Sequence, residues 1–371
     1  MTSIIYVGMD VHTTNYTLCS YSIATGNIFA ETSVDPDYVN IVKYLDKMKR
    51  DLGGDCHFQC GYEAGYLGYS LHNQLAAHDV DCIILAPSTM ATTKKKNGIK
   101  NDKRDARNIA KCLAYGTYSP VYVPTAEDNA VKEYIRMRND ERDTLKRIKQ
   151  QLLSFCTRHG KRFTEGRNYW TQKHMTWLGK LDFGDAVLNE TFLEYIALYH
   201  QAKDKVERFD KRIEELARTE RYDEKVKKLS CFIGVKAHTA LATIVEIGDF
   251  ARFPSAQHYA SYLGLVPGED SSGDSIQRTG ITKAGNSHVR SLMVEAAQCY
   301  SRGAVGAKGK ALKDRQAGNE PRIIAYADRA NERLKRKYYR IMFHSKRNIA
   351  VTAVARELAC FIWGMMTDKI T

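Results

Sequence analysis

The chain has 371 residues, too many for one ordinary core, because chains beyond about 250–300 residues split into domains. Its 56 lysines and arginines against 43 aspartates and glutamates give a net charge of +13, which favours polyanionic partners and nucleic acid above all. No apolar run approaches the about 20 residues that a membrane span needs, and the start lacks a signal-peptide pattern, so we expect a cytoplasmic protein with no membrane partner.

The nine cysteines form no CxxC pair and no spacing typical of a disulfide framework. The nearest approach to a metal-binding pattern is CHFQC at 56–60, whose alternating residues fit a strand better than a zinc site. We therefore expect neither a disulfide scaffold nor bound zinc.

The first predicted element is an apolar run at 4–7, typical of a strand covered on both faces, which leads directly to Asp10. Two β-rich runs on either side of a short turn at 24–27 predict a hairpin. Apolar residues at helical spacing over 38–48 predict a helix after it. The segment CHFQCGYE then predicts another strand that ends near Glu63, and a further buried strand is expected at 80–86.

The stretch KNGIKNDKRDARNIAKCLAYG, beginning at Lys96, sets two aspartates three residues apart among many cations. Asp102 and Asp105 lie in the first turn of a predicted helix, and the side of that helix that faces the sheet carries small or apolar residues. These residues are Ala106, Ile109, Ala110 and Leu113. Both carboxylates are therefore expected to face the sheet.

Four carboxylates thus stand at the ends of predicted elements in one α/β domain, and they are expected to meet at the carboxyl edge of its sheet: Asp10, Glu63, Asp102 and Asp105. Clustered carboxylates repel one another unless divalent cations neutralise them, and oxygen ligands suit Mg²⁺ or Mn²⁺. Two such ions can polarise a phosphate, activate an attacking oxygen and stabilise the leaving one. The pattern predicts metal-dependent phosphoryl transfer.

Cations surround these aspartates, and we expect most of them to bind the phosphate backbone of a nucleic acid. They are Lys94, Lys95, Lys96, Lys100, Lys103, Arg104 and Arg107. The alternative is a solvated helix in which the cations pair locally with the aspartates.

The segment 127–225 is highly charged, and its apolar residues step alternately by four and three residues from Leu188 to Leu216, as the core positions of a heptad repeat do. A shorter series runs from Leu145 to Phe155. Two long helices on either side of an irregular stretch at 160–185 are predicted. They form either a spacer within one chain or a dimer-forming coil, with 188–216 as the expected association surface.

Glycines become frequent again after Leu229, where the sequence predicts helices that alternate with loops. A polar loop, GLVPGEDSSGDS, precedes a helix that opens near Asn286. The last fifty residues hold a basic helix, ADRANERLKRKYYRIM, followed by an amphipathic one. The basic helix, near Arg333–Lys337, is a candidate surface for duplex binding.

Motifs along nearly the whole chain together resemble the DEDD transposases of bacterial insertion sequences. The matching segments are GMDVH, GYEAGYLGYSL, KNDKRDARNIAKCL, IVEIGDFARFPSAQHYASYLGLVPGEDSSG and GITKAGNSHVRSLMVEAA. The resemblance implies an α/β plus α architecture of three parts. These are a RuvC-like domain of RNase H fold at 1–126, a helical coiled-coil arm at 127–225, and a mostly helical transposase domain at 226–371.

In that family a serine that precedes a glycine, after a Gly-Leu-x-Pro segment, is a nucleophile. Ser272 matches this position, with Ser271 as the second choice; Ser275 also lies in the loop. Four cations nearby are expected to grip a phosphate backbone: Arg278, Lys283, His288 and Arg290. The stretch from Phe232 looks like the family's helix-hairpin-helix-like element, although Ile233–Lys236 departs from the usual Pro-Gly-x-Gly turn; Lys236 would compensate electrostatically.

The resemblance implies a transposase that cuts and rejoins DNA, with target choice guided by a structured RNA encoded by the element itself. Dimers or tetramers are expected, because several strands are cut and joined, and one protomer's carboxylates would meet another's Ser272. The main rival is a RuvC-like junction endonuclease that hydrolyses DNA with water. A second rival is a non-catalytic DNA-binding protein.

Overall fold

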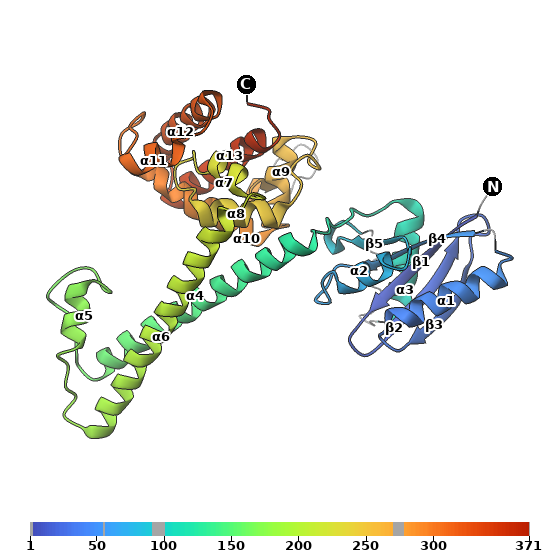
Figure 1. Ribbon diagram of the computed structural model, residues 1–371, viewed down its shortest axis with the longest axis horizontal. Coiled ribbons are helices and arrows are strands. Elements are labelled where there is room, and N and C mark those ends of the chain that lie inside the picture. The colour runs from blue at the N-terminus through green and yellow to red at the C-terminus, as the bar shows by residue number, and fades with distance from the viewer. Residues whose placement is uncertain (1–2, 55, 91–100, 270–277, 371) are drawn as a thin grey trace. The chain divides into compact units, whose positions relative to one another are not determined.

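The computed structural model describes residues 3–54, 56–90, 101–269 and 278–370 (Figure 1). The chain forms two compact units, Met1–Val123 and Pro124–Thr371. The helical arm and the carboxyl-terminal helices belong to the same unit, which thus contains both the second and the third predicted domain.

A five-stranded mixed sheet forms the centre of the first unit. Its strands are β1 (Ser3–Val11), β2 (Tyr16–Ser22), β3 (Ile28–Val34), β4 (Cys56–Glu63) and β5 (Cys82–Leu85). The order across the sheet is β3-β2-β1-β4-β5, in which β1, β2 and β3 are antiparallel neighbours and β4 and β5 run parallel to β1. This topology is that of an RNase H-like domain, and the predicted fold class is confirmed.

Helices cover both faces of the sheet. On one face, α1 (Tyr38–Asp51) and α2 (Ser70–Ala76) pack on the inward residues of alternate strand positions, including Val7 and Met9, both 0% exposed. On the other face lies α3 (Asp102–Tyr115), which contacts β1, β2 and β4. The short 3₁₀ helix η1 (Pro87–Thr89) follows β5.

Glycine at position 8 allows α3 to lie unusually close to the sheet. A Cβ atom at Gly8 would be 2.1 Å from the carbonyl oxygen of Ala106 and 2.4 Å from the backbone nitrogen of Ala110. The small residues Ala106 and Ala110, both 0% exposed, complete this close contact from the helix side. The helix predicted after Asp102 is thus held on the sheet by its small residues, as its spacing indicates.

The arm of the second unit is an antiparallel pair of long helices, α4 (Ala126–Arg158) and α6 (Ala186–Ala217), capped at its tip by α5 (Gln172–Leu178). Figure 1 shows α4 and α6 side by side and α5 at the far end of the pair. Side chains of Thr125 and Asp185 accept hydrogen bonds from the first backbone amides of the two long helices and so fix where each begins.

The heptad residues of α6 pack against α4 of the same chain. Tyr199 and Ala202 are buried in one cluster with Ile148, and the ring of Phe209 meets that of Tyr134 edge-on at 5.6 Å. Of the two predicted alternatives, the structure therefore shows the spacer within one chain. The expectation that the 188–216 heptads form an association surface is wrong for these core positions, because α4 already covers them.

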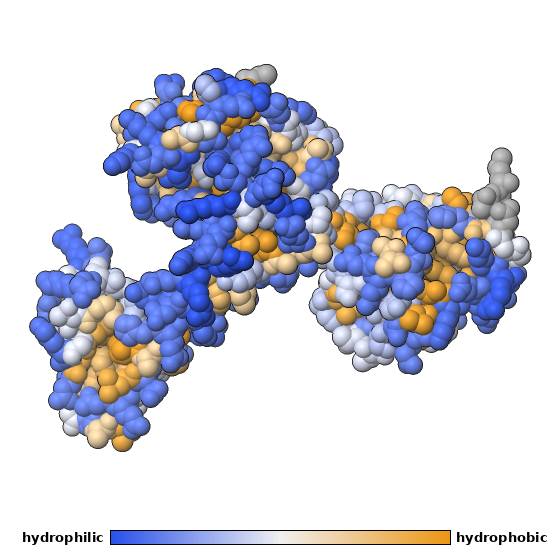
Figure 2. All heavy atoms as spheres, in the orientation of Figure 1, coloured by the Kyte–Doolittle hydropathy of each residue, from blue (hydrophilic) through white to orange (hydrophobic). Residues whose placement is uncertain are grey.

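Hydrophobic side chains also gather on the surface of the arm tip, over α5 and the adjoining part of α6 (Figure 2). A pocket of about 310 Å³ lies there, between α5, the start of α6 and the segment that joins them. Phe192 and Leu178 form its buried wall, whereas Leu193 is 63% exposed at its rim.

The remainder of the second unit is a helical domain with one small hairpin. Its elements are α7 (Asp223–Leu229), α8 (Ala237–Ile247), α9 (Ala256–Tyr262), β6 (Pro267–Glu269), β7 (Arg278–Ile281), α10 (Ser287–Ala297), η2 (Gln298–Ser301), α11 (Lys310–Gln316), α12 (Pro321–Met342) and α13 (Arg347–Met366). The predicted opening of a helix near Asn286 is borne out, because the Asn286 side chain accepts a hydrogen bond from Val289 N at 3.0 Å and caps α10.

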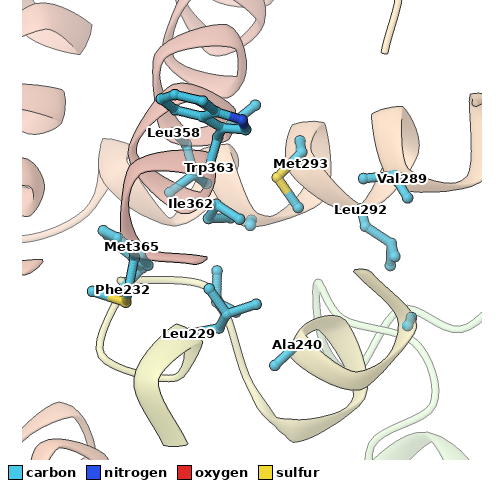
Figure 3. Packing of buried hydrophobic residues seen from close by; sticks show 14 of the residues in the cluster. Leu229, Phe232, Ala240, Val289, Leu292, Met293, Leu358, Ile362, Trp363 and Met365 are labelled. Atoms are coloured by element: carbon cyan, nitrogen blue, oxygen red, sulfur yellow. The ribbon is translucent and has the colours of Figure 1, made fainter. Parts of the chain in front are cut away.

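Figure 3 shows α13 in the core of this domain, where Leu358, Ile362 and Trp363 belong to the same buried cluster as Met293 of α10. By length and composition, α13 is apolar enough to span a membrane. This differs from the expectation from the sequence, in which no apolar run approaches the length of a membrane span. Its residues from Ala350 to Met365 are largely buried among other helices, as in the core helix of a folded domain.

Candidate functional site

Two neighbouring parallel strands bring Asp10 and Glu63 to the same level of the sheet. Met9 pairs with Tyr62 in the parallel register, so Asp10 on β1 and Glu63 on β4 are the next positions along each strand. Side chains alternate along a strand, so Asp10 lies on the same face as Gly8, the face that α3 covers. Asp10 lies inside β1 rather than after its end, since β1 continues to Val11.

The start of α3 brings a second carboxylate to Asp10. The side chain of Asn101 accepts a hydrogen bond from Lys103 N at 3.0 Å and caps the helix, so that Asp102 and Asp105 both fall in its first turn. Asp102 precedes Ala106 by one turn, and Ala106 is the residue that touches the backbone of β1 at Gly8. The close helix–sheet contact therefore places Asp102 above Asp10.

Asp10, His12 and Asp102 form a compact group of ligand atoms. One atom from each lies within 4.8 Å of the others: His12 Nε2 is 3.3 Å from Asp10 Oδ2 and 4.0 Å from Asp102 Oδ1. The three side chains are 15%, 30% and 43% exposed in the order Asp10, His12, Asp102, so the group opens to solvent on the side of α3.

The electrostatics of Asp10 fit a site built for a cation. Burial raises the pKa of Asp10, His12 opposes this, and the nearby charges of Asp102 and Asp105 raise the pKa further. Its Oδ2 is buried and accepts no well-formed hydrogen bond; His12 Nε2 lies 3.3 Å from it and lowers the pKa of Asp10. A buried carboxylate oxygen without a donor is what a divalent ion would satisfy, and the donor set of two carboxylates and an imidazole suits one.

Asp105 and Glu63 lie close to this group without belonging to it. Asp105 is near enough for its charge to raise the pKa of Asp10. Glu63 is the last residue of β4, pairs with Leu85 of β5, and has an exposed side chain. The structure thus gathers Asp10 and Asp102 tightly, with Asp105 beside them and Glu63 one strand away.

His12 was missed by reasoning from the sequence. It follows Asp10 by two residues, and in an extended chain such residues share a face, which is the signal that GMDVH offered. Its position is fixed by a tight loop, because His12 N donates to Asn15 O at 3.0 Å. The hydroxyl of Tyr66, a residue that follows β4, accepts a hydrogen bond from Thr13 N at 3.1 Å and holds the same loop.

The predicted nucleophile Ser272, with Ser271 and Ser275, lies outside the described residues. The ends of that loop are described: β6 and β7 form a short antiparallel hairpin whose loop includes these serines. The base of the hairpin is tight, since a Cβ atom at Gly285, whose φ is +65°, would lie 1.9 Å from Tyr262 O.

Arg290 holds the base of this hairpin. Its Nη1 donates to Leu263 O at 3.0 Å and to Ala284 O at 2.9 Å, so this guanidinium nitrogen binds protein carbonyls on both sides of the hairpin. Of the other cations predicted here, Lys283 and His288 have exposed side chains, and only the backbone of Arg278, in β7, is described.

The cations predicted around the aspartates differ in their surroundings. Lys94, Lys95, Lys96 and Lys100 lie outside the described residues. Lys103 and Arg104 are exposed. Arg107 also pairs within the protein: its guanidinium makes a two-pronged ion pair with Glu31 of β3, with Nη2 at 2.6 Å from Oε2, and its side chain is 46% exposed.

Backbone amides of the turn at 233–236 donate hydrogen bonds to other groups of the protein. Ile233 N donates to Asn331 Oδ1 at 2.9 Å, and Val235 N donates to Phe232 O. Gly234 is required because a Cβ atom there would be 2.3 Å from Ala296 O. The turn thus packs against α10, and those two amides are not available to phosphate; Lys236, just before α8, is exposed.

The cations of the basic helix near Arg333–Lys337 also form ion pairs within the protein. Arg333 Nε and Lys337 Nζ both bind Glu357 of α13, the latter at 2.5 Å, and Arg336 Nη2 is 2.5 Å from Glu332. Lys335 is only 5% exposed. Arg333 and Arg336 are nevertheless 72% and 70% exposed, and duplex binding by this helix stays a prediction.

An RNase H-like sheet with an acidic group between β1 and α3, in a chain that continues into a helical domain, is the architecture expected of a DEDD transposase. The family models agree. A DEDD transposase model matches residues 7–159, and a model described as the transposase IS116/IS110/IS902 family matches residues 226–311. The chain belongs to this family of insertion-sequence transposases and is a DNA phosphoryl-transfer enzyme.

Relatives support this along most of the chain. The transposase for insertion sequence element IS1533 of Leptospira borgpetersenii is 30% identical over 341 residues, which cover 90% of this chain and 95% of that protein. The y4qE protein of Sinorhizobium fredii, whose name marks it as a candidate transposase, is 34% identical over 84% of this chain and 76% of its own length. The transposase for IS1111A of Coxiella burnetii is 23% identical over 81% of this chain and 79% of its own.

Proposed function

We propose that this transposase cuts and rejoins DNA by attack of Ser272 on a backbone phosphate, with Mg²⁺ or Mn²⁺ held by its carboxylates. The observation that carries the proposal is the group of Asp10, His12 and Asp102 at the sheet edge, where a buried oxygen of Asp10 lacks a hydrogen-bond donor. Asp105 and Glu63 complete the donor set as neighbours. A bound divalent ion would supply charge to a phosphate and acidity to an attacking oxygen.

The serine step can be written with all atoms in balance. The Oγ of Ser272 forms a bond to phosphorus, one P–O bond of the DNA backbone breaks, and the leaving deoxyribose oxygen takes the proton that the serine hydroxyl gives up. Rejoining reverses these steps with a hydroxyl from another strand. Because energy of the phosphodiester is kept in the serine ester, no external cofactor is consumed.

The DNA partner follows from the family, and the exposed Lys103 and Arg104 beside the acidic group suit contacts to its phosphates. Guidance by a structured RNA from the element is part of the proposal, and its support is the resemblance of the chain's motifs to guided members of the family. Base pairing would then read the target while the protein binds shape and backbone. We place this reaction in the cytoplasm, where bacterial DNA lies.

A dimer or tetramer is proposed because several strands are exchanged while each chain holds one set of carboxylates and one serine loop. The contact between protomers would use surfaces other than the α6 heptad core, which α4 covers. One protomer's carboxylates would then act with the Ser272 of another.

Trapping of a covalent protein–DNA adduct tests the serine step. The wild-type protein with Mg²⁺ or Mn²⁺, its guide RNA and a target duplex is expected to form an adduct that survives denaturation and maps to Ser272. Ser272→Ala should abolish the adduct and strand cleavage, whereas Ser271→Ala, the matched control one residue away, should retain both.

Cleavage by Ser272→Ala at the wild-type rate would instead support hydrolysis by water, as in a junction endonuclease. Asp10→Ala and Asp102→Ala are expected to abolish cleavage while leaving DNA binding in place. If both variants process DNA normally, the protein acts as a DNA-binding protein and the carboxylates have no catalytic part.

A further inference from the structure

His12 Nε2 lies beside the carboxylates of Asp10 and Asp102, although His12 is not one of the four predicted carboxylate ligands. We infer that His12 binds the metal directly through Nε2, and that this nitrogen donor makes the centre prefer Mn²⁺ and later transition ions to Mg²⁺. The inference rests on the proposed metal-dependent function and adds to it a ligand and a selectivity.

The two distances from His12 Nε2 to the carboxylate oxygens fit ligands of one ion. Ligand atoms about 2.1 Å from a common ion lie about 3.0 Å apart at right angles and about 4.2 Å apart when opposite. His12 Nε2 is 3.3 Å from Asp10 Oδ2 and 4.0 Å from Asp102 Oδ1, so both distances fall within this range. The Oδ2 of Asp10 is the buried oxygen that has no hydrogen-bond donor.

The loop around His12 is built to hold the ring in place. The backbone of His12 is fixed to Asn15, and the next residue, Thr13, is bound by the Tyr66 hydroxyl through both its amide, at 3.1 Å, and its side chain, at 3.4 Å. Tyr66 is 72% exposed, so burial gives little reason for its position. A fixed ligand loop lowers the cost of ordering the site when the ion binds.

A second histidine in the same unit provides the contrast. His57 Nε2 lies 3.6 Å from Asp81, its ring is 59% exposed, and no second carboxylate is paired with it among the described residues. His57 therefore has the surroundings of an ordinary surface histidine beside an acid, whereas His12 stands between two carboxylates that come from different elements.

The consequence for metal choice follows from ligand chemistry. Mg²⁺ is a hard ion that favours oxygen ligands and keeps several waters, so an imidazole adds little to its affinity. First-row transition ions bind nitrogen ligands more strongly, in an order that rises from Mn²⁺ through Co²⁺. Removing His12 should therefore weaken Mn²⁺ binding much more than Mg²⁺ binding.

The test measures metal binding by the full-length protein without DNA. Mn²⁺ titration followed by electron paramagnetic resonance, and competition by Mg²⁺, give both affinities; pulsed measurements report nitrogen hyperfine coupling to bound Mn²⁺. We expect nitrogen coupling in the wild type and its loss in His12→Ala. The same variant should lose at least about tenfold in Mn²⁺ affinity, with Mg²⁺ affinity changed less than about threefold. His57→Ala, the matched control, should match the wild type.

Wild-type Mn²⁺ bound without nitrogen coupling would overturn the inference, and this result needs no variant to fold. So would an unchanged Mn²⁺ affinity in both His12→Ala and the bulkier His12→Gln. Tighter binding of both metals by these variants would also overturn it, because His12 would then act as a competing cation. Asp10→Asn separates the two proposals: if it leaves Mn²⁺ binding intact, the carboxylate centre itself is absent.

Discussion

At the scale of single residues, the candidate metal centre depends on the absence of a side chain at Gly8 as well as on its acidic residues. Asp10 and Asp102 meet because nothing larger than hydrogen separates Gly8 from the backbone of α3 at Ala106 and Ala110. A methyl group at position 8 would overlap backbone atoms, which cannot turn aside as a flexible side chain can. The helix would have to move, and Asp102 would move with it.

Gly8→Ala is expected to destabilise the first unit by about 3 kcal/mol and to weaken Mn²⁺ binding although no ligand is changed. Thermal unfolding and metal titration of the same preparation measure both effects. Gly65→Ala is the control, because a Cβ there would meet only Glu63 O, at 3.9 Å, and its effect should stay within about 0.5 kcal/mol. Equal stability of the two variants would contradict the role assigned to Gly8.

Residue roles were the least predictable part of the site. The four carboxylates could be predicted because each lies in or beside a recognisable strand or helix. No periodic pattern of residues includes His12, so it could not be predicted in the same way. The residues that bind the cations within the protein could not be predicted, for a different reason. Glu31 is 76 residues from Arg107, Glu357 is 24 from Arg333, and Leu263 is 27 from Arg290, and no local pattern connects such pairs.

At the scale of elements, the arm is a two-helix coiled coil closed by its own tip. Leu152 of α4, 0% exposed, packs with Phe155, Leu178 and Phe192, so all three arm helices meet at one cluster. Across the pair, Arg138 of α4 binds Asp210 of α6 through two nitrogens at 2.7 and 3.1 Å. These contacts fix the register of the two helices without help from another chain.

Leu152→Ala should destabilise the arm by about 2–5 kcal/mol, because it leaves a cavity where three helices meet. Leu193→Ala, on the 63% exposed side chain at the tip pocket, should change stability by less than about 0.5 kcal/mol. Hydrogen exchange of the arm amides distinguishes local from global loss. If Leu152→Ala instead alters only the association state, the helices pair between chains.

The long elements were predictable and the short ones were not. Heptad spacing indicates α4 and α6, and small residues at helical spacing indicate α3, because many positions repeat the same signal. The sequence predicts a plain loop where β6 and β7 form a hairpin, because strands of three and four residues carry too few alternating positions. Helix α5 was missed within an irregular aromatic stretch for the same reason of length.

At the scale of the molecule, the residues of the proposed reaction are divided between the two units. The acidic group belongs to the first unit and the hairpin that bears the serines belongs to the second. The second unit also contains buried titratable groups that make its stability depend on pH. Burial, reinforced by Arg138 and Arg142 against the opposing charge of Asp210, lowers the pKa of His238 to about 4.

The second unit is expected to lose stability as the pH falls from 6.5 toward 4. In this range the unfolded His238 binds a proton that the folded one does not, so the free energy of unfolding decreases by on the order of 2 kcal/mol. Thermal unfolding of the wild type and of His238→Gln should show a shallower pH profile for the variant. Some slope should remain, because burial also lowers the pKa of His174.

The exposed His344 is the control for this experiment, and His344→Gln should keep the wild-type profile. Below this range a further loss is expected. Burial raises the pKa of Glu246, but hydrogen bonds from Arg136 and Asn286 outweigh it and hold that pKa below 4.5, so protonation removes the stabilisation as the pH falls further. A profile that is flat from neutral pH to 4 would contradict the assignment of His238, and one that stays flat below pH 4 would contradict that of Glu246.

Because α4 and α6 form an antiparallel pair, the length of the arm can be changed in fixed steps. The 32 residues of α6 extend about 48 Å, and each heptad accounts for about 10 Å of that reach. Because the two helices are paired in register, trimming seven residues from one alone would misalign every layer beyond the cut, whereas trimming seven from each shortens the arm by one whole step. A series of variants whose arms are shortened in this way would show whether transposition requires a fixed distance between the tip and the base of the arm.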